Sequence, residues 1–459
     1  MTSRKKQIIV NAFNMNCVGH INHGAWTHPR DTSMNYTRLD YWTSLAATLE
    51  RGLFDGIFLA DILGTYDVYG GNVDLTLRES IQLPVNDPIL LISAMAAVTR
   101  HLGFGVTVNV NQEPPYTFAR RMSTLDHLSG GRIGWNIVTG YLDSAARAVG
   151  RDAQTGHDLR YDQADEYLDV LYKLWEGSWQ DDAVRRDRAA RVYADPSRVH
   201  KVIHHGRFYD VEGWHLSEPS AQRTPVLYQA GTSGRGQRFA ARHAECVFIG
   251  AATPEAARKT ADEIRAAVVA AGRQAEDVKI LVGINVVADR SAAAAAEKLA
   301  DYLAHASPEA GLAHFAASTG IDLARFGLDD PIPYGTTNAI QLATRQAQSQ
   351  NWTRRDLLAR HALGGRYPVV SGSAVQVADE LERWIDVGGI DGFNLTRIVT
   401  PETYEDFADL VVPELQNRGR FKTAYAPGTL RHKLFGAGDR LPARHAVQPF
   451  RYGARQAAE

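Results

Sequence analysis

The feature that most constrains the fold is an alternation of short apolar segments with amphipathic helical ones along the 459 residues. Eight segments are rich in β-branched and aromatic residues and are bounded by glycine, proline or polar residues, which is typical of buried strands. They are 7–13, 54–60, 103–110, 132–139, 225–230, 245–250, 278–287 and 391–399. Apolar residues at helical spacing lie between them, as in 37–52, 255–271 and 373–388. Eight such units predict an α/β fold, a (β/α)8 TIM barrel; a doubly wound sheet is the alternative, because strand count alone does not decide closure.

Three intervals between predicted strands are too long to be simple connections. They span roughly 62–88 after the second strand, 140–224 after the fourth and 288–390 after the seventh. Connections in compact α/β folds run about 2–6 residues, so insertions of this length indicate functional lids or subunit contacts. We therefore expect one barrel domain over 1–459 with three insertions, and we expect the 288–390 insertion to act as a lid.

Composition excludes several classes of protein. Fifty Lys and Arg residues against 52 Asp and Glu give a net charge of −2, which argues against nucleic-acid binding and against a polybasic membrane surface. No run of about 18 apolar residues occurs, so we expect no membrane span. The two cysteines, Cys17 and Cys246, are too few for a disulfide framework and fit a reducing compartment. We expect a soluble, cytoplasmic protein.

Polar side chains lie at or near the carboxyl ends of three predicted strands. Residues of 103–110 alternate, so that Thr107 and the neighbouring glycines share the face opposite the apolar one. In a barrel that face reaches the mouth, where active sites lie. Asp61 directly follows the second strand and suits either a ligand contact or a helix or turn cap. Asn136 in the fourth strand can donate and accept hydrogen bonds toward an amide-rich ring.

The segment Gly231-Thr232-Ser233-Gly234-Arg235-Gly236 follows the fifth strand and precedes a helix. Glycine N–H groups at a helix start, with hydroxyls and an arginine, favour phosphate binding over a plain tight turn. A nucleophilic serine is disfavoured, because Arg235 stands where the G-x-S-x-G motif needs its second glycine.

Histidines gather near the amino terminus, but their spacing does not indicate a metal site. His20 and His23 match neither HExxH nor a 2-His-1-carboxylate pattern, so we expect no metal. His204 and His205 are expected to point opposite ways on a solvated hairpin. Cys17 is expected to be a small buried apolar residue rather than a nucleophile.

Motifs along almost the full length, in order, resemble one enzyme family. They are NAFNMNCVGHINHGAWTHP (11–29), FDGIFLADILGTYDVY (54–69), QLPVNDP (82–88), ARRMSTLDHLSGGRIGWNIVTGYL (119–142), HDLRYDQADEYLDVLYKLWEGSW (157–179), RTPVLYQAGTSGRG (223–236), GLAHFAASTG (311–320) and GIDGFNL (389–395). The chain resembles the bacterial-luciferase-like flavin monooxygenases. Within them it resembles the branch of nitrilotriacetate, dibenzothiophene-sulfone, dimethylsulfide and long-chain alkane monooxygenases, and the long-chain alkane enzymes most of all.

The resemblance implies a set of site residues. For FMN contacts it implies Asp61, Thr107, Asn136, His157, Tyr161 and Ser233, with Ser233 on the phosphate. For catalysis it implies His20, Tyr66 and His314, and for the substrate region Cys17, Gln82 and Tyr141. Tyr141 stands where the alkane enzymes have histidine, and Asn111-Gln112 replaces their Thr-Tyr; both departures lie near the expected mouth.

The resemblance also implies the reaction and the partners. A separate flavin reductase would supply FMNH2, and O2 would provide the oxygen atom that passes to a small organic substrate. His20 and His314 would act as proton donors or hydrogen-bond partners, since imidazole ordinarily titrates near neutral pH. With few cations at the mouth beyond Arg235 and Arg397, an apolar or sulfur-containing substrate is favoured over a polyaminocarboxylate. A homodimer or homotetramer is expected; the alternatives are a deazaflavin-dependent oxidoreductase and a non-catalytic flavin-binding barrel.

Overall fold

The computed structural model describes residues 5–231, 233–332 and 351–453. Eight parallel strands close into a barrel, and each matches a predicted strand to within a few residues at its ends. They are β1 (Ile9–Met15), β2 (Gly56–Ala60), β3 (Gly103–Asn109), β4 (Ile133–Val138), β9 (Val226–Gln229), β10 (Cys246–Ile249), β11 (Lys279–Asp289) and β13 (Gly392–Thr396). The TIM barrel predicted from the sequence is therefore confirmed, and the doubly wound sheet is excluded.

Two pairings close the sheet on itself. β1 pairs with both β2 and β13, and β10 pairs with both β9 and β11. The long β11 then extends past β13, and its last residues pair with β12 (Val369–Ser373), a ninth strand that the sequence patterns did not predict. β12 leads directly into α13 (Ala374–Asp386), whose capping box of Ser373 and Gln376 is present as predicted.

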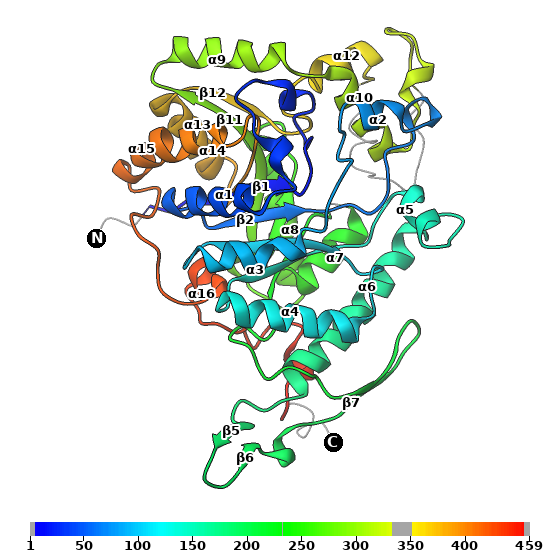
Figure 1. Ribbon diagram of the computed structural model, residues 1–459, viewed down its shortest axis with the longest axis vertical. Helices are drawn as coiled ribbons and strands as arrows, with labels where there is room; N and C mark the ends of the chain where they lie inside the picture. Colours follow the sequence, from blue (N-terminus) through cyan, green and yellow to red (C-terminus); the bar gives the residue numbers. More distant parts are fainter. Residues whose placement is uncertain (1–4, 232, 333–350, 454–459) are drawn as a thin grey trace.

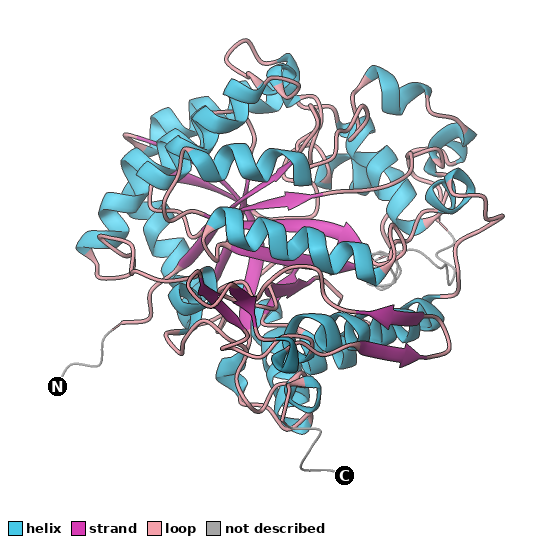
Figure 2. Ribbon diagram, turned by 60° about the horizontal axis from the view of Figure 1, so that its bottom comes forward, coloured by secondary structure: helices cyan, strands magenta, loops and turns pink. Residues whose placement is uncertain are grey.

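Helices cover the outer face of the barrel (Figures 1 and 2). They include α1 (Leu39–Arg51), α3 (Ile89–Ala97), α4 (Pro115–Ser129), α6 (His157–Tyr172), α7 (Gly234–His243), α8 (Pro254–Ala270), α13, α14 (Glu402–Asp406) and α15 (Val412–Asn417). Outward side chains of the strands pack against them, as Trp135 of β4 does with Phe118 of α4. No helix within the described part of the chain is long and apolar enough to cross a membrane.

The barrel interior is filled by aromatic side chains. Phe13, Phe58, Tyr228 and Phe248 form a buried cluster with edge-on ring contacts. A Cβ at Gly105 would lie 3.1 Å from the Phe58 ring, so the glycine face of β3 leaves room for these rings. The alternation predicted for 103–110, with small and polar residues inward, is confirmed. At the amino end of the strands, α16 (Leu430–Phe435) closes the barrel with Leu430 and Leu434.

The three long intervals form separate additions to the barrel. The first holds α2 (Asp74–Arg78), and the second holds α5 (Asp143–Ala148) with the hairpins β5 (Val184–Asp187)–β6 (Val192–Ala194) and β7 (Val202–His205)–β8 (Asp210–Gly213). The hairpins extend from the lower part of the molecule in Figure 1. The third holds α9 (Ala292–Ala304), α10 (Pro308–Thr319), α12 (Arg354–Arg360) and β12; its residues 333–350 lie outside the described ranges.

Helices from these different additions meet beyond the carboxyl end of β2. α2, α5 and α10 lie together at the upper right of Figure 1. An apolar cluster joins them, formed by Tyr66, Leu75, Ile81, Leu142, Ala310, Ala313 and Ala317. Part of each addition therefore contributes to one cover beside the barrel mouth, whereas the two hairpins of the second addition lie elsewhere. His204 and His205 point opposite ways on the β7–β8 hairpin, as predicted: His205 is exposed, and His204 is buried, with Nε2 3.2 Å from the Glu166 carboxylate.

Candidate active site

The residues that lead from β9 into α7 form a cradle of backbone N–H groups and hydroxyls around Ser233. Ser233 caps α7, its Oγ accepting a hydrogen bond from the Gly236 N–H at 3.0 Å, and the same Oγ lies 3.2 Å from His157 Nε2. A Cβ at Gly231 would come within 2.5 Å of Tyr161 Oη, so only glycine allows this approach. His157 is the first residue of α6 and Tyr161 lies one turn later, as the predicted shared face requires. Free helix N–H groups and two hydroxyls suit a phosphate group.

Arg235, the second residue of α7, is held by carboxylates of α6. Its guanidinium is paired with Asp162 at 2.9 Å and Asp165 at 2.5 Å, and it lies over the Tyr161 ring. Two carboxylates therefore offset its charge, and a role for this arginine in phosphate binding stays a prediction. It joins α7 to α6 and so holds Tyr161 and His157 in place.

Between the cradle and the covered mouth, β3 and β4 present a pair of polar side chains. Thr107 and Asn136 are opposite each other in the strand register, and Asn136 Nδ2 donates to Thr107 Oγ1 at 2.9 Å. Asn136 Oδ1 and Gln229 Oε1 are buried without a hydrogen-bond partner among the described residues. Orphaned buried amide oxygens are costly, so a ligand N–H group is expected to satisfy them. The amide-bearing ring of a flavin fits this requirement.

Asp61 and Cys17 lie close together at the ends of β2 and β1. Burial raises the pKa of the Asp61 carboxyl to about 6 and that of the Cys17 thiol to about 12. The Cys17 thiol donates to the Gly19 carbonyl at 3.2 Å. Because the thiol stays protonated, Cys17 can line the site but is a poor nucleophile, which agrees with its predicted role.

Tyr66 is the centre of a group contributed by all three additions. Its hydroxyl donates to Gln82 Oε1 at 2.6 Å and lies 3.5 Å from Tyr141 Oη and 3.4 Å from His314 Nε2. The Tyr66 and His314 rings are stacked with centroids 4.9 Å apart. The structure thus brings together Tyr66, Gln82, Tyr141 and His314, which the resemblance implied for catalysis and for the substrate region. Burial raises the pKa of Tyr66 and Tyr141, so both remain neutral hydroxyls.

His20 and His314 are both buried at the mouth, and this changes their expected chemistry. The His20 ring packs edge-on against Phe13 with centroids 4.6 Å apart. Burial, with Arg397 beside His20 and His23 beside His314, lowers the pKa of each imidazole well below its usual range. The expectation that they titrate near neutral pH is wrong; both are neutral hydrogen-bonding groups.

Three residues of this region were not identified from the sequence. Gln229 carried no signal beyond its strand, and Arg366, whose Nη2 lies 3.5 Å from His314 Nε2, lies in an interval with no recognisable motif. His23 was considered only as a metal ligand, yet its Nε2 lies 3.0 Å from His314 Nδ1. Arg397 also differs from expectation, because it is buried and donates to the carbonyls of Cys17 and Val18.

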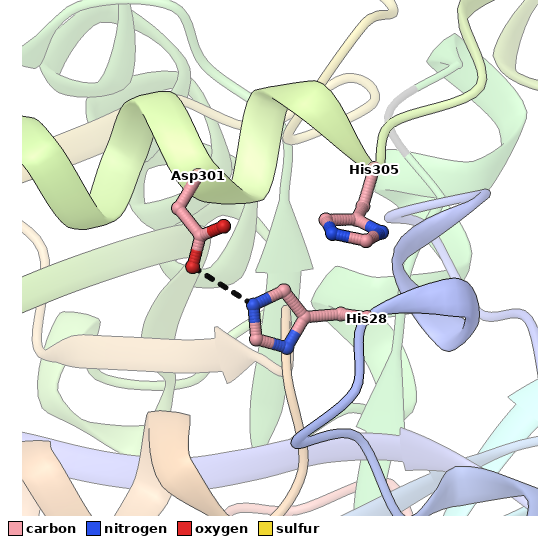
Figure 3. A group of neighbouring side chains, drawn as sticks. All are labelled: His28, Asp301 and His305. Carbon is pink, nitrogen blue, oxygen red and sulfur yellow. Dashed lines mark hydrogen bonds and ion pairs between the residues drawn. The ribbon is translucent and has the colours of Figure 1, made fainter.

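One group of metal-ligand type occurs among the described residues, away from His20. Figure 3 shows His28, Asp301 and His305, with His28 Nε2 3.0 Å from the Asp301 carboxylate. His28 Nδ1 accepts the Arg30 backbone N–H, which places the His28 proton on Nε2, the atom a metal would need. The Arg30 guanidinium also contacts the same Asp301 oxygen at 3.2 Å. These contacts favour a hydrogen-bonded link between the loop and α9 over a metal site.

Comparisons of the sequence and the structure with those of known proteins identify related enzymes. Residues 20–390 match the family model described as luciferase-like monooxygenase. The dimethyl-sulfide monooxygenase of Hyphomicrobium sulfonivorans is 48% identical over 97% of this chain and 94% of its own length. The crystal structure of a long-chain alkane monooxygenase superimposes with a TM-score of 0.92 at 47% identity, covering 97% of this chain and all 100% of the other. A crystal structure of riboflavin lyase with modified FMN and riboflavin has a TM-score of 0.92 at 36% identity, covering 97% and 100%.

These similarities extend over nearly the whole chain, insertions included. The matching structures share the closed barrel, and the dimethyl-sulfide and long-chain alkane relatives, the two most similar in sequence of those named above, are monooxygenases. The polar groups described above lie at the carboxyl end of the strands, where enzymes with this fold place their active sites. The chain belongs to the luciferase-like monooxygenase family and is a monooxygenase of the flavin-dependent type.

Proposed function

We propose that the protein is the oxygenase component of a two-component system that uses FMNH2 and O2 to oxygenate a small apolar or sulfur-containing molecule. The observation that supports it most is the division of the mouth into two parts. A phosphate cradle at Ser233 lies on one side and a neutral hydrogen-bonding group around Tyr66 on the other, with orphaned amide oxygens between them.

Each part of the mouth has a distinct task in this proposal. Ser233, His157 and Tyr161 bind the phosphate, and Asp61, Thr107 and Asn136 orient the ring. When bound, reduced FMN supplies the electrons that activate dioxygen. Tyr66, His20 and His314 then offer neutral hydrogen bonds beside the reacting oxygen, and the cover made by α2, α5 and α10 excludes bulk water.

The charges at the mouth favour an uncharged substrate. Arg235 and Arg397 are both occupied, the first by two carboxylates and the second by two carbonyls. Arg366 is a single guanidinium near His314, whereas a polyaminocarboxylate has several carboxylates to neutralise. Cys17 and Tyr141 provide soft, largely apolar surface. The alkane and sulfide relatives act on molecules of the favoured kind.

The remaining partners follow from the same proposal. A separate flavin reductase supplies the FMNH2, and the oxygenase assembles as a homodimer or homotetramer. The two unpaired, buried cysteines, Cys17 and Cys246, fit a reducing compartment such as the cytoplasm. Sedimentation analysis of the purified chain distinguishes the two assemblies from a monomer.

An oxygen-uptake screen tests the function. The purified protein, FMN, NADH and a generic flavin reductase are mixed with dialkyl sulfides, alkanes of several lengths, sulfones or nitrilotriacetate. We expect substrate-dependent oxygen uptake and a monooxygenated product with members of the first three groups. Turnover with a reduced deazaflavin and no oxygen uptake would indicate hydride transfer instead. Absence of binding to FMN in both redox forms would overturn the proposal.

A further inference from the structure

Asp165, in the middle of α6, contacts α7 at both of its ends. One oxygen of the carboxylate lies 2.5 Å from Arg235 Nη2, and Arg235 belongs to the first turn of α7. The other oxygen lies 2.8 Å from His243 Nε2, and His243 is the last residue of the same helix. A single side chain of α6 therefore fixes the position of α7 along it.

The contacts of His243 define its hydrogen bonds. Burial raises the pKa of Asp165, but the His243 N–H and the Arg235 guanidinium lower it further, so the carboxylate is ionised and only accepts. Burial lowers the pKa of the His243 imidazole to about 4, so the ring is neutral and donates its one N–H, at Nε2, to Asp165. Its Nδ1 then accepts from the Tyr172 hydroxyl at 3.0 Å. His243 is thus held on both sides by groups of α6.

The first turns of the same two helices meet at the cradle. A Cβ at Gly236 of α7 would lie 2.9 Å from Tyr161 Oη of α6, so the helices approach as closely as glycine allows. His157 Nε2 of α6 lies 3.2 Å from Oγ of Ser233, the N-cap of α7. The groups that face the proposed phosphate therefore come from both helices. A shift of α7 along α6 changes the distances between them, and binding by several hydrogen bonds at once is sensitive to such shifts.

The other ion pairs between α6 and α7 each hold one end of α7 only. Asp162 pairs with Arg235 at 2.9 Å, but 47% of its side chain is exposed against 20% for Asp165, so solvent screens its pair more. Arg242 lies 3.1 Å from Asp169 and 3.5 Å from Asp165, both contacts at the far end of α7. Among the described carboxylates of α6, only Asp165 contacts both the first turn and the last residue of α7.

We propose that Asp165 and His243 are positioning residues that hold α7 against α6 at the spacing that a flavin phosphate requires. The proposal rests on the proposed function, in which the cradle binds FMN by its phosphate. Neither residue belongs to the cradle: His243 lies at the opposite end of α7 from Ser233, and Asp165 lies two turns beyond His157. The residues proposed to orient the ring lie on or directly after β2, β3 and β4, so loss of this link should affect binding of the phosphate and not of the ring.

Two amide substitutions of His243 test the link without changing a charge. His243→Gln can place an amide N–H near the position of Nε2, facing Asp165, whereas His243→Asn places it near Nδ1 and leaves Asp165 without this donor. The full-length apoprotein is titrated by fluorescence with FMN and with riboflavin, which lacks the phosphate. We expect His243→Asn to weaken FMN binding about tenfold, the effect of about one hydrogen bond, and to leave riboflavin binding within about twofold. His243→Gln should resemble the wild type. A general loss of stability would affect both flavins alike, and an equal ratio of the two affinities in both variants would contradict the proposal.

A matched pair of truncations on α6 separates position from charge. Asp165→Ala and Asp162→Ala each remove one carboxylate from Arg235, and loss of a negative charge near a phosphate should by itself tighten FMN binding. We expect FMN to bind Asp162→Ala as tightly as the wild type or more so, and Asp165→Ala at least about tenfold more weakly, with riboflavin binding within about twofold in both. Tighter FMN binding by Asp165→Ala would overturn the proposal, because it would show that Asp165 holds Arg235 back from the phosphate.

The wild-type protein distinguishes failure of this proposal from failure of the proposed function. If it binds riboflavin as tightly as FMN, the cradle does not bind a phosphate, and both proposals fail whatever the variants do. If it prefers FMN and the Asp165 and His243 variants keep that preference, the cradle stands and only the positioning role fails.

Discussion

Substitution of Ser233 separates the two roles of its hydroxyl, which caps α7 and faces the proposed phosphate. Ser233→Asp keeps a side-chain oxygen that can accept the Gly236 N–H, because aspartate caps helices as well as serine does. The same change places a negative charge beside the phosphate. Ser233→Ala has the opposite effect: it removes the cap and adds no charge.

The expected magnitudes follow from this geometry. Two unit charges about 4–5 Å apart repel by about 1 kcal/mol in water, and a dianionic phosphate doubles this to about 2 kcal/mol. Loss of a hydroxyl bond to a charged oxygen costs about 1.5–3 kcal/mol. Ser233→Asp should therefore weaken FMN binding by at least about a hundredfold, and Ser233→Ala by about tenfold or somewhat more. Only Ser233→Ala should lower the free energy of unfolding, by about 1 kcal/mol.

The assay is an anaerobic titration of the protein with photoreduced FMN, alongside fluorescence titration of oxidised FMN and urea unfolding of the apoprotein. Ser291→Asp is the matched control, since Ser291 caps α9 in the same way but lies outside the cradle. It should change neither affinity nor stability appreciably. Unchanged FMN affinity in Ser233→Asp would refute the assignment of the cradle, whereas reduced stability in that variant would refute the capping argument.

Three further outcomes are expected. His20→Ala and His314→Ala should retain FMN binding but lose most oxygenation, measured as product formed per oxygen consumed; unchanged turnover in both would remove them from the mechanism. Burial raises the pKa of Asp61 to about 6. The contribution of this carboxyl to the free energy of unfolding is therefore complete below its unfolded pKa near 3.9, and it is lost as the pH rises through 6. Asp61→Asn should therefore raise the free energy of unfolding by about 1–3 kcal/mol at pH 8, and urea titrations should show the gain disappearing toward pH 4. Arg431→Met should lower the free energy of unfolding by about 3–5 kcal/mol in the same urea titrations, because it leaves the buried Glu245 carboxylate without its guanidinium partner. Adding Glu245→Gln to this variant should restore part of the lost stability. No recovery in the double variant would contradict the view that the unpaired carboxylate causes the loss.

Local patterns predicted much of the barrel because they depend on neighbours in the chain. The eight strands were identifiable from apolar runs bounded by turn residues, and the inward face of β3 from simple alternation. The start of α7 at Ser233 was also identifiable, since a helix cap and its glycines are contiguous, whereas phosphate binding there stays a prediction. β12 was missed because its sequence, Val369–Ser373, is short and half polar, and it exists as a strand through pairing with the extended end of β11.

Side-chain partners were the least predictable part of the site. Arg235 was expected at the phosphate because it lies in the loop, but Asp162 and Asp165, some 70 residues earlier, hold its guanidinium. His23 showed no sign of its contact with His314, which lies 291 residues later. No local pattern reports on contacts over such separations; the resemblance to a family identified His314, Tyr66 and Gln82, but not how they are joined.

The amino-acid sequence alone therefore determined the strand and helix pattern, the glycine-rich turn capped by Ser233 before α7, and the family, all of which are properties of contiguous segments. Only the tertiary structure decided that the sheet closes through the β1–β13 and β10–β11 pairings, and that three additions meet around Tyr66. It also decided the charge states at the mouth. Burial among residues distant in sequence keeps His20 and His314 neutral and Tyr66 protonated, because desolvation depends on the packed surroundings and not on the residue type.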